Sequence, residues 1–313
     1  MSGGVEDGLL LLNKKSGVTS FESLHSVKRA FGTGKAGHTG TLDKFATGLL
    51  LVLLGKGLKL ASLLSACDKE YVATVRFGEE TDTLDPEGEI IARAPPPSLT
   101  DVESVLDVFR GKILQSPPVY SAIHINGRRA HELAREGKAP EMKKRPVTIY
   151  SLDIVSFSPP DMVIKVRCSS GTYIRSLAGD IAKAAGSRAH LSALQRTSVG
   201  NFHLKDSADA DSQDLTSLVR PLDRKLFSSL DMPCFFLDEG QAKDFLHGKQ
   251  LSRIISGEGS NVSEEIAAGV FRKSSFGQND EKDGGKGDEE TGELLGFIRG
   301  INGTWRYGHV FQS

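Results

Sequence analysis

Cysteine and long apolar runs are scarce in this chain of 313 residues, and each scarcity excludes a class of protein. The three cysteines, Cys67, Cys168 and Cys234, are irregularly spaced, which excludes a disulfide framework and a thiolate metal site. The best candidate for a membrane span, Leu49 to Leu54, is far too short to cross a bilayer. The chain begins with acidic and Gly-rich residues, whereas a secretory signal peptide begins with basic ones. We therefore expect a cytoplasmic protein without a membrane partner.

An excess of charge of one sign is also lacking, since the formal net charge is only -1. This value averages unlike segments, because the stretch 256–294 carries ten acidic and four basic residues. The rest of the chain is mildly basic, with 35 Lys and Arg against 30 Asp and Glu. That balance permits an RNA partner without requiring one. Within the acidic stretch, residues 274–291 have almost no apolar side chain, which predicts a disordered insertion.

The chain is long enough for about two domains, and its hydrophobic patterns predict an α+β protein. Short buried strands are expected at 9–12 and 49–54, and a half-buried strand at 69–78, where apolar residues alternate. Capping boxes that start at Thr19 and Thr100 predict two helices. Further strands are expected at 145–157 and 162–168.

The last part of the chain has a different pattern, which predicts a small β-rich domain. A short helix is expected at 241–251, followed by strands at 294–298 and 304–311. Asn302 and Gly303 lie between these strands and are typical of a hairpin turn. We therefore expect one domain over residues 1–230 and a second over 231–313.

The segment 36–48 combines an imidazole and a carboxylate, those of His38 and Asp43, with three glycines and three threonines. Glycines let a ligand approach the backbone, and threonine hydroxyls bind polar groups. We expect a short loop held between an amphipathic helix and an apolar strand, which would form a rigid support for a site. Taken alone, the loop is also compatible with an ordinary turn in which Asp43 accepts a hydrogen bond from its own backbone.

Residues 32–37 read G-T-G-K-A-G and match a dinucleotide-binding pattern. The match follows a predicted helix, whereas the fingerprint follows a strand, and the acidic residue expected about 20 positions later is missing. Ala36 also stands where a phosphate-binding loop has serine or threonine. Neither NAD nor ATP is therefore expected as a cofactor.

Further stretches follow the loop in order. They read KEYVATVRFG at 69–78, QSPPVYSAIHINGRRAHELAREG at 115–137 and GTYIRSLAGD at 171–180. The last of these predicts a strand that enters a helix through a Gly-Thr turn, with Arg175 in the first turn. An arginine at this end is unfavourable in the field of the helix dipole, so we expect a carboxylate partner nearby.

Together with the loop sequence GHTGTLDKFATGLL, these stretches resemble the motifs of the TruB family of pseudouridine synthases, which isomerise a uridine in the T-loop of transfer RNA. The resemblance implies the pseudouridine synthase fold, built on a mixed, mostly antiparallel sheet with flanking helices. It also implies a PUA-like RNA-binding domain at 231–313. The implied enzyme makes pseudouridine at position 55 of the T-stem-loop. It would act as a monomer, with no cofactor, no metal and no obligate protein partner.

The resemblance also implies a role for individual residues. Asp43 is the implied catalytic carboxylate at the sugar, and Arg175 pairs with it and keeps it ionised. The residues implied to bind the substrate are His38 near the target base, Tyr71 stacked on it, Tyr173 and Leu194 as pocket walls, and Lys14.

Two departures from the family motifs concern the segment 115–137. His124 stands in place of the usual lysine, and His131 in place of the usual tyrosine. The consequences of these replacements for RNA contacts stay open at this point.

The chemistry of Asp43 also stays open, because a carboxylate there can attack C1′ of the sugar or remove a proton from C2′. Three other functions remain to be weighed. They are a transfer-RNA folding chaperone, a guide-RNA-dependent synthase, and a metal-dependent hydrolase that uses His38 and Asp43.

Overall fold

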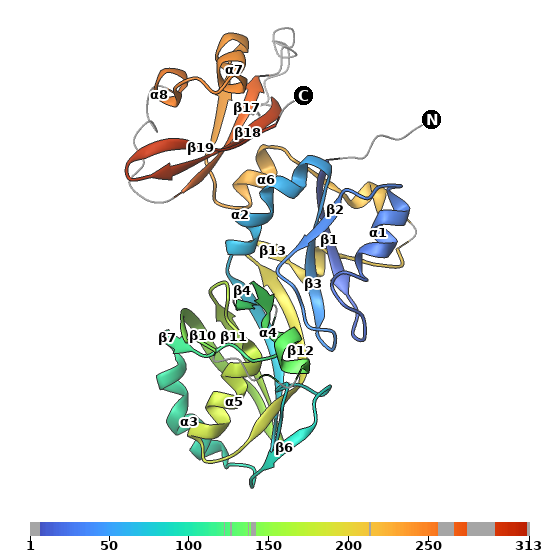
Figure 1. Ribbon diagram of the computed structural model, residues 1–313, viewed down its shortest axis with the longest axis vertical. Helices are drawn as coiled ribbons and strands as arrows, with labels where there is room; N and C mark the ends of the chain where they lie inside the picture. Colours follow the sequence, from blue (N-terminus) through green and yellow to red (C-terminus); the bar gives the residue numbers. More distant parts are fainter. Residues whose placement is uncertain are drawn as a thin grey trace, which may run out of the picture.

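The computed structural model describes residues 7–121, 123–125, 127–136, 138, 142–212, 214–255, 266–273 and 292–311 (Figure 1). Within this part the molecule is elongated, with a large sheet of 11 strands and a separate C-terminal sheet of four. The predicted α+β class is therefore confirmed. No helix in the described part is long and apolar enough to cross a membrane. The insertion predicted at 274–291 lies outside the described residues.

Leu, Val and Ile dominate the strands of the large sheet. These strands are β1 (Gly8–Lys14), β2 (Ala36–Thr39), β3 (Thr47–Leu54), β4 (Lys69–Phe77), β7 (Gly111–Gln115), β10 (Arg145–Ser158), β11 (Asp161–Cys168), β12 (Ala189–Val199), β13 (Phe202–His203), β14 (Ala208–Asp209) and β15 (Arg220–Pro221). Their order is β14-β1-β3-β12-β4-β11-β10-β7, with β13, β15 and β2 paired to β12, β1 and β3. Within this sheet the pairs β1–β14 and β3–β12 are parallel and its other described pairs are antiparallel, as expected.

Helices and short hairpins connect these strands. The helices are α1 (Leu24–Ala30), η1 (Gly55–Leu60), α2 (Ala61–Ala66), α3 (Leu99–Leu106), η2 (Asp107–Phe109), α4 (Ala130–Arg135), α5 (Ile174–Ala184), η3 (Leu204–Asp206), η4 (Thr216–Leu218) and α6 (Arg224–Ser228). Two small hairpins are formed by β5 (Glu79–Thr81) with β6 (Ile90–Arg93) and by β8 (His124–Ile125) with β9 (Arg128–Arg129). Helices α3 and α5 pack against each other beside β4 and β12, and their apolar residues form one buried cluster with the sheet (Figure 1).

The predicted start of α3 was wrong by two residues. The sequence suggested a capping box of Thr100 with Glu103, but Ser98 is the N-cap, and it exchanges hydrogen bonds with Asp101. Both pairs have the spacing of a capping box. The prolines at 95–97 end immediately before Ser98, and its extended backbone (ψ 163°) makes it the residue at which the helix starts.

The segment 36–48 contains more regular structure than the sequence suggested. Residues Ala36–Thr39 form the strand β2, which pairs antiparallel with β3. The loop proper is therefore only the seven residues between β2 and β3. His38 lies on the strand, while Asp43 lies in the loop. The two side chains therefore do not share one flexible segment.

The C-terminal sheet consists of β16 (Cys234–Leu237), β17 (Ala267–Lys273), β18 (Gly292–Ile301) and β19 (Thr304–Val310), with helices α7 (Glu239–Leu246) and α8 (Leu251–Ile254) beside it. The predicted hairpin is confirmed, since Asn302 and Gly303 join β18 to β19 with φ of 51° and 77°. The strands β16 and β17 were not predicted from the sequence. One apolar cluster joins Phe227 and Phe271 to β1 and β3, so the division at residue 230 stays a prediction.

Candidate active site

The loop that carries Asp43 is fixed by buried residues on both sides of it. Leu42 and Ala46 are buried in the apolar cluster that contains α5 and β4. The Ser20 hydroxyl accepts a hydrogen bond from the Leu42 amide (2.8 Å) and donates one to its carbonyl (3.0 Å). Asp43 therefore projects from a loop whose backbone has little freedom.

Lys14 supports the same loop through hydrogen bonds to its backbone carbonyls. Its ammonium group is buried and donates hydrogen bonds to the carbonyls of Ala46 (2.6 Å), Lys15 (3.0 Å) and Lys44 (3.3 Å). Burial lowers the pKa of Lys14 to about 8. The side chain of this predicted substrate-binding residue is thus bound to the backbone of the loop. Lys14 is not among the residues that line the neighbouring cavity.

Replacing Lys14 by methionine should therefore destabilise the fold. The change leaves buried carbonyls without a donor, which we expect to lower the free energy of unfolding by about 2–3 kcal/mol. Chemical denaturation would measure this loss. Lys15→Met is the matched control, because Lys15 is exposed and its ion pair within the described residues is with exposed Asp211. A Lys14→Met protein of unchanged stability but weakened ligand binding would instead assign Lys14 to the substrate.

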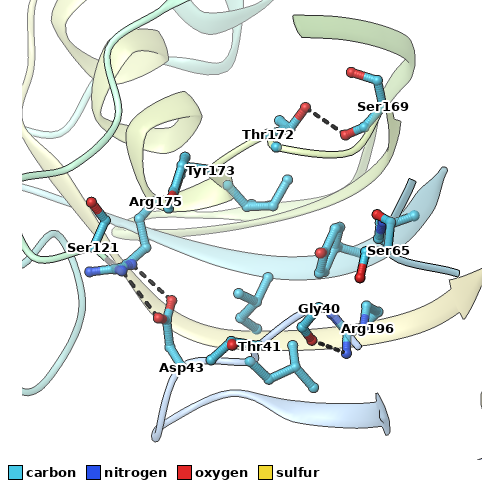
Figure 2. A pocket seen from close by; sticks show the side chains of 16 residues that line it. Gly40, Thr41, Asp43, Ser65, Ser121, Ser169, Thr172, Tyr173, Arg175 and Arg196 are labelled. Atoms are coloured by element: carbon cyan, nitrogen blue, oxygen red, sulfur yellow. Dashed lines mark hydrogen bonds and ion pairs between the residues drawn. The ribbon is translucent and has the colours of Figure 1, made fainter. Parts of the chain in front are cut away.

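The Asp43 carboxylate and the Arg175 guanidinium face each other (Figure 2). Arg175 Nε lies 2.9 Å from Oδ2 of Asp43, and Nη2 donates a hydrogen bond to Oδ1 at 3.1 Å. The Arg175 side chain is 5% exposed, whereas that of Asp43 is 36% exposed. The sequence predicted a carboxylate near Arg175, and the structure confirms this pairing.

Other groups hold Arg175 in this orientation. Nη1 donates to the carbonyl of Thr83 (2.7 Å) and to Oδ2 of Asp85 (3.2 Å), and Nη2 also donates to the carbonyl of Tyr120 (3.0 Å). Asp85 is buried, so Arg175 bridges one buried and one partly exposed carboxylate. The guanidinium is consequently fixed before any ligand binds.

The electrostatics of Asp43 reflect opposing effects. Burial raises the pKa of Asp43 above its usual value, the charge of Arg175 opposes this shift, and the charge of Asp85 adds to it. The arginine therefore compensates only part of the cost of holding an ionised carboxylate here.

A cavity of about 310 Å³ opens beside this ion pair. Its volume lies at the lower end of the range for small-ligand sites. All but two of the predicted site residues line it, namely Asp43, Arg175, Tyr71, Tyr173 and Leu194. Tyr71 and Leu194 are buried on the neighbouring strands β4 and β12, and Tyr173 stands at the start of α5.

Gln115 fixes the backbone of Tyr173. Its buried side chain accepts a hydrogen bond from the Tyr173 amide (2.8 Å) and donates one to the Tyr173 carbonyl (3.0 Å). The start of α5 is thereby tied to β7, and the ring is held at one side of the cavity (Figure 2).

His38 lies outside the residues that line the cavity. Its Nδ1 is buried and has no hydrogen-bond partner within the described residues. Burial lowers the pKa of His38, and the charge of Arg196 adds to that shift, so both effects favour a neutral ring.

The predicted catalytic loop lies within a part of the chain that matches the model of a known protein family. Residues 28–174 match the model described as "TruB family pseudouridylate synthase (N terminal domain)". Over 218 residues the chain is 49% identical to tRNA pseudouridine synthase B of Borreliella burgdorferi, covering 69% of this chain and 77% of that protein. The chain belongs to the TruB family. It is also 46% identical to the tRNA pseudouridine synthase B of Francisella philomiragia over 237 residues, covering 74% of this chain and 77% of that protein.

Solved structures extend the likeness in fold to nearly the whole TruB chain. A chain in the crystal structure of the archaeal box H/ACA sRNP Nop10-Cbf5 complex matches with a TM-score of 0.65 and 19% identity. The match covers 98% of this chain and 86% of that one. At this identity the match shows that the pseudouridine synthase fold is shared.

Arg196 and Asp85 belong to this TruB site, although neither had a role predicted from the sequence. Arg196 is 1% exposed, and its guanidinium donates to the carbonyls of Leu49 (2.7 Å) and Gly40 (2.9 Å). It follows Leu194 by two positions on β12, so strand alternation alone could have placed it on the cavity side. Asp85 had no such signal, because only the fold brings it to Arg175.

The described residues contain no group of three or more His, Cys, Asp or Glu that could hold a metal ion. His124 and His131 are family departures whose side chains lie outside the described part, so their contacts are not described.

Proposed function

We propose that this protein isomerises a uridine of transfer RNA to pseudouridine, at position 55 in the T-loop. The observation that carries the proposal is the fixed pair of Asp43 and Arg175 at the edge of a cavity, in a chain of the TruB family. The curated relatives named tRNA pseudouridine synthase B support the choice of substrate.

The reaction exchanges one bond to the sugar for another. The bond between N1 of the base and C1′ breaks, and a bond between C5 and C1′ forms. C5 loses its proton, and N1 gains one. The isomerisation has no net redox change. Asp43 serves it either by adding to C1′ or by removing a proton from C2′, and both routes need an ionised carboxylate. Arg175 favours that form by its charge.

The target base must leave its stack to reach Asp43. Base flipping costs a few kcal/mol, which contacts within the pocket must offset. Tyr71, Tyr173 and Leu194 provide aromatic and apolar surfaces in the cavity. In this proposal Tyr71 stacks on the uracil, and His38 assists the flipped conformation from β2, at the margin of the site.

The backbone beside the base also needs neutralising charge. Lys69 and Arg196 line the same cavity, and Asp43 is the carboxylate among its lining residues. Both basic side chains are buried and donate to backbone carbonyls, so they act through the positive field in the cavity, and that field supports an anionic ligand such as RNA. Under this proposal the enzyme acts as a monomer and needs no obligate protein partner. Under this proposal the enzyme acts in the cytoplasm.

The test is a reaction of the purified protein with a T-stem-loop transcript. We expect one uridine to become pseudouridine, detected by mass spectrometry after chemical labelling. A transcript with cytidine at that position is the matched control and should remain unmodified. Tight binding of the transcript without isomerisation would overturn the proposal in favour of a folding chaperone.

A further inference from the structure

The turn that supplies Asp85 to the site is tightly cross-linked within itself. The Leu84 amide donates to the Thr81 carbonyl (3.1 Å), and the Thr81 hydroxyl donates to the Asp85 carbonyl (2.8 Å). The Thr83 hydroxyl and the Glu87 amide donate to Oδ1 of Asp85, at 2.6 Å and 3.0 Å. Oδ2 of Asp85 is therefore left for Arg175.

Leu84 adopts an unusual backbone conformation at the centre of this turn. Its φ is 59°, in the left-handed region that non-glycine residues rarely occupy. Strained backbone of this kind persists where surrounding contacts impose it, and it concentrates at functional sites. Here the Leu191 amide of β12 donates to the Leu84 carbonyl at 3.1 Å, which ties the strained residue to the large sheet.

The side chain of Leu84 lies against α5 at Gly179. A Cβ atom built on Gly179 would lie 3.5 Å from Cδ2 and 3.9 Å from Cδ1 of Leu84. Gly179 follows Arg175 by four residues, so the two positions share one face of the helix. The turn thus contacts this face at two points, with Leu84 at Gly179 and with Thr83 and Asp85 at Arg175.

We propose that Leu84 is a positioning residue for the isomerisation, acting through Asp85 and Arg175. Its side chain against Gly179 and the hydrogen bond from the Leu191 amide to its carbonyl hold the turn beside α5, where the Thr83 carbonyl and the Asp85 carboxylate both contact Nη1 of Arg175. Nη2 of Arg175 then donates to Oδ1 of Asp43, and Nε lies 2.9 Å from Oδ2. This inference rests on the proposed function, because it concerns the carboxylate assigned to that reaction.

Double-mutant kinetics test the pathway. We expect Leu84→Ala to lower kcat about tenfold with KM changed less than about twofold, and Leu84→Met to restore most of kcat. The double variant Leu84→Ala/Asp85→Asn should be within about twofold of Asp85→Asn alone, because both changes release the same arginine. Leu204→Ala is the control, since this half-buried leucine packs in the cluster shared with the C-terminal sheet. Losses that multiply in the double variant would overturn the inference.

A second measurement does not depend on activity. Hydrogen exchange of the Arg175 Nε–H group, followed by NMR in the full chain, reports how firmly the guanidinium is held. We expect exchange about tenfold faster in Leu84→Ala than in the wild type, Leu84→Met or Leu204→Ala. Unchanged exchange in Leu84→Ala would overturn the role of Leu84. A wild-type protein with protected Nε–H but no isomerase activity would overturn only the proposed function.

Discussion

Replacing Asp43 by asparagine should reduce the rate of pseudouridine formation by at least about a thousandfold, while affinity for the T-stem-loop changes less than about threefold. Asparagine keeps the shape of the side chain and removes the ionised oxygen that both possible mechanisms need. The fold should tolerate the change, because Arg175 keeps the Asp85 carboxylate and the carbonyls of Thr83 and Tyr120 as acceptors. Single-turnover rates and filter binding measure the two quantities separately.

Asp161→Asn is the matched control for this experiment. Asp161 likewise pairs with an arginine, since it accepts two hydrogen bonds from Arg76, but the two side chains are 33% and 47% exposed and lie outside the cavity. We expect this variant to retain wild-type turnover. If Asp43→Asn kept more than a trace of activity, the carboxylate would lose its assigned role. Activity in a complementation assay with Asp43→Asn would likewise favour a chaperone.

The features that were predictable from sequence depend on short-range patterns. The alternation from Tyr71 to Phe77 gave β4 and put Tyr71 on the buried side. The helix dipole argument gave Arg175 a carboxylate partner, and the family resemblance named Asp43. Each of these inferences needs only neighbouring residues or a motif, which a single sequence contains.

The features that were missed depend on distant contacts. The family resemblance implied a substrate contact for Lys14, yet two of its acceptors are carbonyls 30 and 32 residues away. Asp85 reaches Arg175 across 90 residues. No local spacing encodes either contact. The misplaced start of α3 had a different cause, since Ser98 and Thr100 fit the same capping pattern and only the backbone selects between them.

Replacing Arg175 by lysine or methionine should impair catalysis more than RNA binding. In Arg175→Lys the charge remains but the fork that holds Oδ1 and Oδ2 of Asp43 is lost, so we expect kcat to fall about 100-fold with KM changed less than about threefold. Arg175→Met should also lower stability, because it leaves the buried carboxylate of Asp85 unpaired. Thermal unfolding would identify that effect, and Arg175→Lys is therefore the variant on which the kinetic argument depends.

The pH dependence of the wild type and of Arg175→Met shows whether Arg175 lowers the pKa of Asp43. Burial raises the pKa of Asp43, so activity in the wild type should fall on the acid side at a higher pH than for an exposed aspartate. Arg175 opposes that rise and Asp85 adds to it, so the pKa of Asp43 rises further when the arginine is removed. Because only the ionised carboxylate is active, the acid limb of the single-turnover rate should move to higher pH in Arg175→Met. An unmoved limb with equal losses in kcat and RNA affinity would assign Arg175 to a phosphate contact instead.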